Sequence, residues 1–194
     1  LGSGSWATAL AKIVMHNVAE INWYIRKQET IDEFREIRRN PNHLEWAYFD
    51  ISRINFSNDI NQVLSEAELV ILAVPSPYVK DVLAEITVDM SQKKVISAVK
   101  GMIPGDNILV TDYMHQHFHV PEANLGMITG PCHAEEIALE RLSYLTIGCK
   151  DTANATEWKK LFDTPYVRTT PSNDMKGLEY ASVMKNIYAI AAGM

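Results

Sequence analysis

The chain has 194 residues, of which 47% are hydrophobic and 22% are charged. This length is enough for one domain and part of a second, with a core that needs neither disulfides nor metals to form. The formal net charge of −6 argues against a protein held on nucleic acid by bulk charge, although a locally positive pocket can still bind a small anion.

Apolar runs of strand length alternate with amphipathic stretches of helix length along most of the chain. We expect strands over 21–25, 53–56, 67–74, 94–99, 127–129, 145–148 and 167–170, and helices over 6–18, 28–39, 59–65, 77–86, 107–117, 133–140, 153–162 and from 174 to the end. The stretch 39–51 shows little periodicity and is expected to be an ordered surface loop. This alternation predicts an α/β fold with a doubly wound, mostly parallel sheet.

The cysteines and the absence of long apolar runs indicate the cellular location of the protein. Cys132 and Cys149 do not form a CxxC pair, and we interpret them as two reduced thiols. No apolar run approaches the roughly 18 residues of a membrane span, and no signal peptide opens the chain, so we expect a cytoplasmic protein with no membrane span.

The chain begins with Leu1-Gly2 inside a turn and ends at Met194 inside an apolar helical run, so we expect a piece of a longer protein.

The first residues fit a dinucleotide-binding fingerprint. The stretch from Gly2 to Ala7 reads G-x-G-x-x-A and runs directly into the helix expected over 6–18. Gly2 permits a tight turn, Gly4 lets the backbone approach a pyrophosphate, and Ala7 allows close packing of helix and strand. The alternative is a chance glycine-rich loop, because the preceding strand is represented only by Leu1.

A basic pair follows the strand expected over 21–25. Dinucleotide-binding proteins specific for NAD usually have an acidic residue at this distance from the glycines, where it binds the ribose. Arg26 and Lys27 stand there instead, and a guanidinium suits a ribose 2′-phosphate. We therefore favour NADP(H), or use of both NADP(H) and NAD(H). The alternative interpretation is a solvated basic pair.

Three later turns follow expected strands, at the edge where a doubly wound sheet binds its cofactor. The first is Val74-Pro75-Ser76-Pro77, the second contains Lys100-Gly101, and the third is Gly130-Pro131-Cys132-His133-Ala134-Glu135-Glu136. Their structural alternatives are a proline turn, a solvated lysine and a plain helix start, respectively.

Lys185 and Asn186 lie in the middle of the last helix, next to Met184 and Ile187. A charged group in apolar surroundings is costly unless it is paired or functional. The alternative is a lysine whose amine reaches solvent along an apolar stem.

The segments GSGSWATAL, SAVKGM, GPCHAEEIA and GLEYASVMKNIYAIAAGM, in this order, strongly resemble the bacterial-type NAD(P)-dependent glycerol-3-phosphate dehydrogenase family. The resemblance covers essentially the whole chain. It implies a Rossmann-like dinucleotide-binding domain over 1–172, with its first strand mostly missing, and the first helix of a truncated α-helical substrate domain over 173–194. It also implies reversible reduction of dihydroxyacetone phosphate to sn-glycerol 3-phosphate, which feeds glycerophospholipid synthesis. Members of the family are often dimeric, which makes a homodimer the candidate assembly.

The resemblance also implies roles for single residues. Lys185 matches the catalytic lysine, and Lys100 matches a residue shared by cofactor and substrate. The expected substrate contacts are Lys100, Gly130, Cys132, Lys185 and Asn186. The expected cofactor contacts are Gly2, Gly4, Ser5, Trp6, Arg26, Lys100 and Ala134. Cys132 stands where the family usually has Ser or Thr, so only its backbone N–H is carried over with the motif.

Lys185 is therefore our candidate general acid and base for a hydride-transfer reaction. A free lysine titrates near 10.4, and we expect burial and the positive charge of Lys100 to lower the pKa of Lys185. Two rival functions remain open, which are another Rossmann-fold dehydrogenase and a non-catalytic NADP(H)-binding module. A metal site formed by His115, His117 and His119 is a third alternative, but no cysteine lies nearby to complete it, and we predict no metal.

Overall fold

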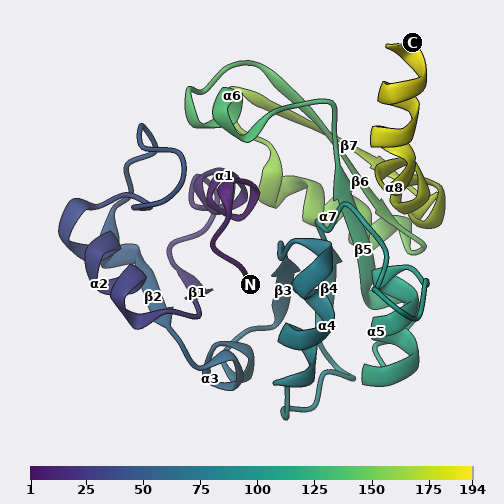
Figure 1. The fold of residues 1–194 in the computed structure, drawn as a ribbon, viewed down its shortest axis with the longest axis horizontal. Helices are drawn as coiled ribbons and strands as arrows, with labels where there is room; N and C mark the ends of the chain where they lie inside the picture. The colour runs from purple at the N-terminus through teal and green to yellow at the C-terminus, as the bar shows by residue number, and fades with distance from the viewer. Residues whose placement is uncertain (194) are drawn as a thin grey trace.

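The computed structural model describes residues 1–193, apart from the side chain of Asn186, and shows strands flanked by helices (Figure 1). The strands are β1 (Ile21–Tyr24), β2 (Ile54–Ser57), β3 (Leu69–Leu72), β4 (Lys94–Ser97), β5 (Leu125–Thr129), β6 (Ser143–Cys149) and β7 (Val167–Ser172). The helices are α1 (Ser5–Val14), α2 (Gln28–Ile37), α3 (Ile60–Ser65), α4 (Ser76–Ala84), α5 (Val110–Phe118), α6 (Ala134–Ala138), α7 (Thr152–Phe162) and α8 (Met175–Ala192), with 3-10 turns η1 (Ile51–Arg53) and η2 (Glu122–Asn124).

The strands form two sheets. Five of them pair in the order β3-β4-β5-β6-β7, and β1 pairs with β2 separately. All pairs are parallel except β5 with β6, which is antiparallel. The helical connections place the carboxyl ends of β3, β4 and β5 at one edge of the sheet. The predicted doubly wound, mostly parallel α/β fold is confirmed.

The beginning of the chain lies between the two sheets. The amine of Leu1 donates to the Ile71 carbonyl oxygen at 2.7 Å, and the Ala73 N–H donates to the Leu1 carbonyl oxygen at 2.9 Å. The Trp23 indole N–H donates to the Gly2 carbonyl oxygen at 2.7 Å. Leu1 and Gly2 therefore bridge β3 and β1, as the position of the N-terminus between these strands in Figure 1 shows.

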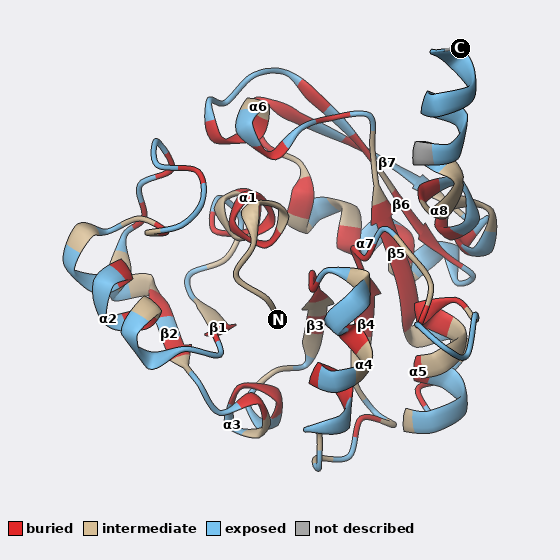
Figure 2. Ribbon diagram, viewed as in Figure 1, coloured by how far each residue is buried: buried red, intermediate tan, exposed pale blue. Residues whose placement is uncertain are grey.

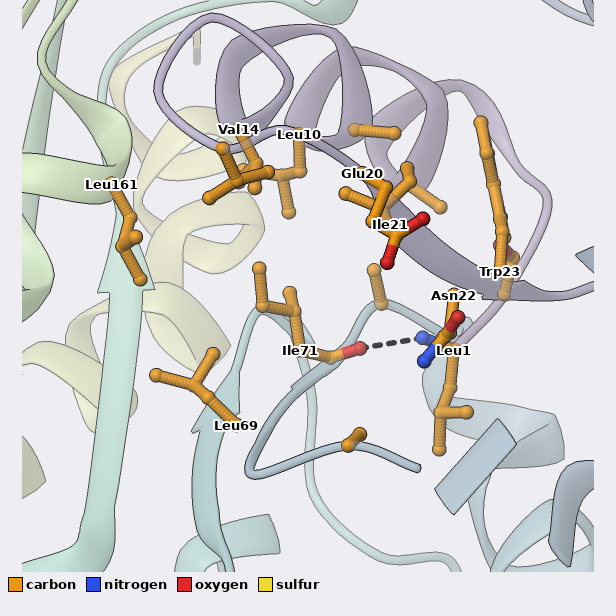
Figure 3. A pocket seen from close by; sticks show the side chains of 16 residues that line it. Leu1, Leu10, Val14, Glu20, Ile21, Asn22, Trp23, Leu69, Ile71 and Leu161 are labelled. Atoms are coloured by element: carbon orange, nitrogen blue, oxygen red, sulfur yellow. Dashed lines mark hydrogen bonds between the residues drawn. The ribbon is translucent and has the colours of Figure 1, made fainter. Parts of the chain in front are cut away.

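A mostly apolar cavity of about 300 Å³ continues this gap between the sheets (Figure 3). The labelled side chains that line it include Leu10 and Val14 of α1, Ile21 of β1, Leu69 and Ile71 of β3, and Leu161 of α7.

The core lies on both faces of the five-stranded sheet, and Figure 2 shows the buried residues concentrated along the strands. Ile96 and Ile128 pack on the face covered by α1 and α7. Val95 and Met127, their chain neighbours, pack on the opposite face with α3, α4 and α5. Successive residues of a strand point to opposite faces, so strands covered on both sides are apolar throughout.

The two largest differences from the expected boundaries are at helix ends. The fifth helix begins at Val110 rather than near 107, because Asn107 has a left-handed backbone (φ 55°) and closes a turn by donating its N–H to the Ile103 carbonyl oxygen at 2.9 Å. The first helix ends at Val14 rather than 18. Arg53 donates to carbonyl oxygens beyond this end, including that of Met15 at 2.7 Å, and so closes the helix.

Both cysteines are buried free thiols, in agreement with the prediction. Within the described part of the chain, every helix is too short or too polar to cross a membrane. His115 and His117 turn to different partners: Nδ1 of His115 lies 2.9 Å from the Val120 carbonyl oxygen, and the ring of His117 stacks on Tyr113. Across residues 1–193, no cluster of three or more potential metal ligands is found.

Candidate functional site

The glycine turn is shaped by close packing against the sheet. Gly2 has a φ of 109°, and a methyl group there would lie 2.5 Å from the Ala73 carbonyl oxygen, so only glycine fits. A methyl group on Gly4 would meet no atom within 4 Å, which leaves open space beside the backbone just before α1. The first N–H groups of a helix lack partners within the helix and attract anions. The first turn of α1 has no acidic residue to compete with such an anion.

A buried asparagine holds the glycine turn in place. The amide of Asn40 is almost fully enclosed and donates to the Ser3 carbonyl oxygen at 2.9 Å and to Thr8 Oγ1 at 2.8 Å. Three residues further along the same loop, Nδ1 of His43 lies 3.2 Å from Ser5 Oγ. The sequence analysis missed both residues, because neither belongs to a periodic segment or to the fingerprint.

Arg26 is exposed and lies two residues beyond the end of β1. The hydrogen bond from Trp23 to Gly2 holds this end of β1 beside the glycine turn. The structure therefore places the end of β1, two residues before Arg26, beside the turn, and the ribose phosphate contact stays a prediction.

Lys100 lies over the first turn of α1. It follows β4, and its Nζ lies 4.7 Å from the centroid of the Trp6 ring, within the range of a cation–π interaction. Partial burial lowers the pKa of the Lys100 amine, and the positive charge of Lys185 lowers it further. The indole N–H of Trp6 is itself buried without a hydrogen-bond partner.

The turns after β3 and β4 pack directly against each other. A methyl group on Gly101 would lie 2.4 Å from the hydroxyl oxygen of Ser76, the first residue of α4. The start of α4 and Lys100 are therefore adjacent at the carboxyl edge of the sheet.

The turn after β5 is equally tight. A methyl group on Gly130 would lie 2.2 Å from the Tyr144 carbonyl oxygen. Cys132 and Ala134, which follow, are both buried. Burial raises the pKa of the Cys132 thiol, while the positive charges of Lys100 and Lys185 act in the opposite direction.

Lys185 corrects one expectation. Its side chain is exposed, so the burial predicted from its apolar sequence neighbours is wrong. Those neighbours do not surround the amine, because α8 leaves the sheet in this region and Ile187 is itself 56% exposed. Lys185 nevertheless lies about one turn beyond Ser182, whose hydroxyl donates to Thr129 Oγ1 beside Gly130. The side chain of Asn186 lies outside the described residues.

Parallel strands and the turns that follow them have therefore brought the predicted residues to one edge of the fold. A glycine turn before a helix N-terminus, at the carboxyl edge of a mostly parallel sheet flanked by helices, is typical of a dinucleotide-binding α/β domain.

Comparison with known proteins identifies the family. Residues 1–155 match the family described as NAD-dependent glycerol-3-phosphate dehydrogenase N-terminus. The whole chain is 30% identical to proteins named glycerol-3-phosphate dehydrogenase [NAD(P)+] from Exiguobacterium sp. and Oceanobacillus iheyensis. It covers 57% and 56% of their lengths.

A solved structure of Plasmodium falciparum glycerol-3-phosphate dehydrogenase matches 99% of this chain and 56% of its own, with 30% identity and a TM-score of 0.89. The chain thus belongs to the NAD-dependent glycerol-3-phosphate dehydrogenase family, and it spans a little over half the length of the relatives that it matches.

Proposed function

We propose that the full-length protein is an NAD(P)-dependent glycerol-3-phosphate dehydrogenase that reversibly reduces dihydroxyacetone phosphate to sn-glycerol 3-phosphate. The observation that carries this proposal is the match of residues 1–155 to this family, in a chain whose Lys100 lies over the first turn of α1, directly after the glycine turn. The product is a precursor of glycerophospholipids, and we assign the protein to their synthesis. We further propose a cytoplasmic location and a homodimer.

The residues of the glycine turn fit a nicotinamide dinucleotide. Gly2 allows the tight turn against Ala73, and Gly4 leaves the backbone open beside the N-terminus of α1, where Ser5 and Trp6 begin the helix. We propose that these four residues hold the pyrophosphate, with Arg26 at the adenosine ribose and Ala134 on the nicotinamide side. NAD(P)H supplies the hydride for the reduction when it is bound.

The substrate lies, in this proposal, between Lys100 and the turn from Gly130 to Cys132. The Lys100 ammonium attracts the phosphate and polarises the carbonyl, and the backbone N–H of Cys132 is a donor to substrate oxygen. Lys185 gives a proton to the carbonyl oxygen in reduction and takes it back in oxidation. Asn186 is proposed to orient the substrate.

We propose the domain boundary after residue 172. The strand β7 ends at Ser172, and α8 begins at Met175. In this proposal residues 1–172 form the dinucleotide-binding domain and 173–194 the first helix of a helical substrate domain.

Replacement of the proposed acid and base tests the function. Lys185→Met in the full-length protein should lower kcat for dihydroxyacetone phosphate by a factor on the order of 10² to 10⁴, because the proton donor is lost. NADPH binding, followed by its fluorescence, should change less than about twofold, because the glycine turn is untouched.

Lys160→Met is the matched control, since Lys160 is exposed on α7, and it should retain full activity. A Lys185→Met enzyme with most of its rate would refute the assignment. A wild-type protein that binds NADPH but does not oxidise it with dihydroxyacetone phosphate would refute the proposed reaction.

A further inference from the structure

Among the residues that the structure describes, Glu179 is the only acidic or basic residue that is buried, with 0% of its surface exposed. An unpaired carboxylate costs free energy in a buried position, so the hydrogen-bond partners of Glu179 indicate its role.

The partners of Glu179 lie at the start of another helix. Thr111 donates its hydroxyl to Oε2 of Glu179 at 2.5 Å and its backbone N–H to Oε1 at 3.2 Å. Thr111 is the second residue of α5, and the residue before this helix, Leu109, gives it no side-chain cap. A carboxylate next to the free N–H groups of a helix satisfies them and complements the helix dipole. Glu179 of α8 therefore caps α5.

The next turns of α8 continue toward the proposed active site. Three residues after Glu179, the hydroxyl of Ser182 donates to Thr129 Oγ1 at 2.8 Å, directly before Gly130. Lys185 follows three residues later. Residues three apart are neighbours on a helix, so Ser182 links Glu179 to Lys185, and the six residues span about 9 Å. The contacts of Glu179 and Ser182 thus set the direction in which α8 carries Lys185.

We propose that Glu179 is a positioning residue, which fixes α8 on α5 and thereby holds the Lys185 amine in register with Lys100 and the turn at Gly130. The proposal rests on the proposed function. Burial raises the pKa of the Glu179 carboxyl, whereas the hydrogen bonds from Thr111 and from the Val110 backbone act in the opposite direction.

A second contact between the same helices supplies a control. Lys176 of α8 lies 3.0 Å from Asp112 of α5, and the Lys176 side chain is 53% exposed. Exposed ion pairs contribute little to stability. Removal of the Lys176–Asp112 pair therefore tests whether the loss of any contact between α5 and α8 lowers activity, or only the loss of the contact made by Glu179.

The experiment compares variants of the full-length protein. Thr111→Val removes the donor hydroxyl at nearly constant volume, and Glu179→Gln removes the charge. Each should lower kcat for dihydroxyacetone phosphate by about 10- to 100-fold, because a displacement of about 1 Å is enough for a loss of this size. The KM for NADPH should stay within about twofold of the wild-type value, since the glycine turn belongs to other elements. Thr111→Ser, which keeps the hydroxyl, should restore kcat, and Asp112→Asn should leave it unchanged.

Thermal unfolding separates positioning from simple destabilisation. If Thr111→Val is folded at the assay temperature and keeps the wild-type kcat, the proposal is wrong. It is also wrong if Asp112→Asn lowers kcat as strongly as Thr111→Val does. If Glu179→Gln does not fold, the comparison of kcat between Thr111→Val and Thr111→Ser tests the proposal. An inactive wild-type protein would instead refute the proposed function.

Discussion

At the scale of single residues, the basic side chains that we assign to the site come from separate elements. Arg26 follows β1, Lys100 follows β4 and Lys185 lies on α8. The sequence predicted all three as functional residues from their positions after strands or within an apolar helix. It did not predict the environment of Lys185 correctly, because burial depends on which elements pack around a helix and not on its own neighbours in sequence.

Arg26 should determine cofactor preference. Replacement by glutamine removes the guanidinium that we assign to the ribose 2′-phosphate, and we expect the Kd for NADPH to rise about tenfold, the value of one charge-assisted hydrogen bond. The Kd for NADH should change little. Fluorescence titration with both cofactors measures this difference. Arg168→Gln, at an exposed arginine of β7, is the control, and an equal loss for both cofactors would contradict the assignment.

At the scale of helices and strands, the sequence predicted most of the elements because each has a clear apolar period and several have a terminal signal. It did not show that β5 and β6 are antiparallel, since strand direction is set by the connection and leaves no local pattern. It also missed Asn40 and Glu179, whose partners lie 32 to 68 residues away in the chain. Such partners come together only in the folded chain, so no local sequence motif indicates these contacts.

The start of α7 is an example of a local signal that the structure explains. Asp151 accepts hydrogen bonds from the N–H groups of Ala153 at 2.8 Å and Asn154 at 3.4 Å. Asp151→Ala should lower the free energy of unfolding by about 0.5 to 2 kcal/mol, because these N–H groups lose their acceptor. Asp151→Asn keeps an acceptor and should lose much less. Urea unfolding of both variants provides the measurement, and equal losses would show that the side chain does not act as a cap.

At the scale of the whole molecule, the glycine turn joins the two sheets. The Trp23 indole N–H of β1 donates to the Gly2 carbonyl oxygen, and the Ala73 N–H after β3 donates to the Leu1 carbonyl oxygen.

The turn that links the two sheets is also the turn whose backbone at Gly4 opens onto the N-terminus of α1. A ligand that binds only the folded turn therefore also stabilises the contact between the sheets.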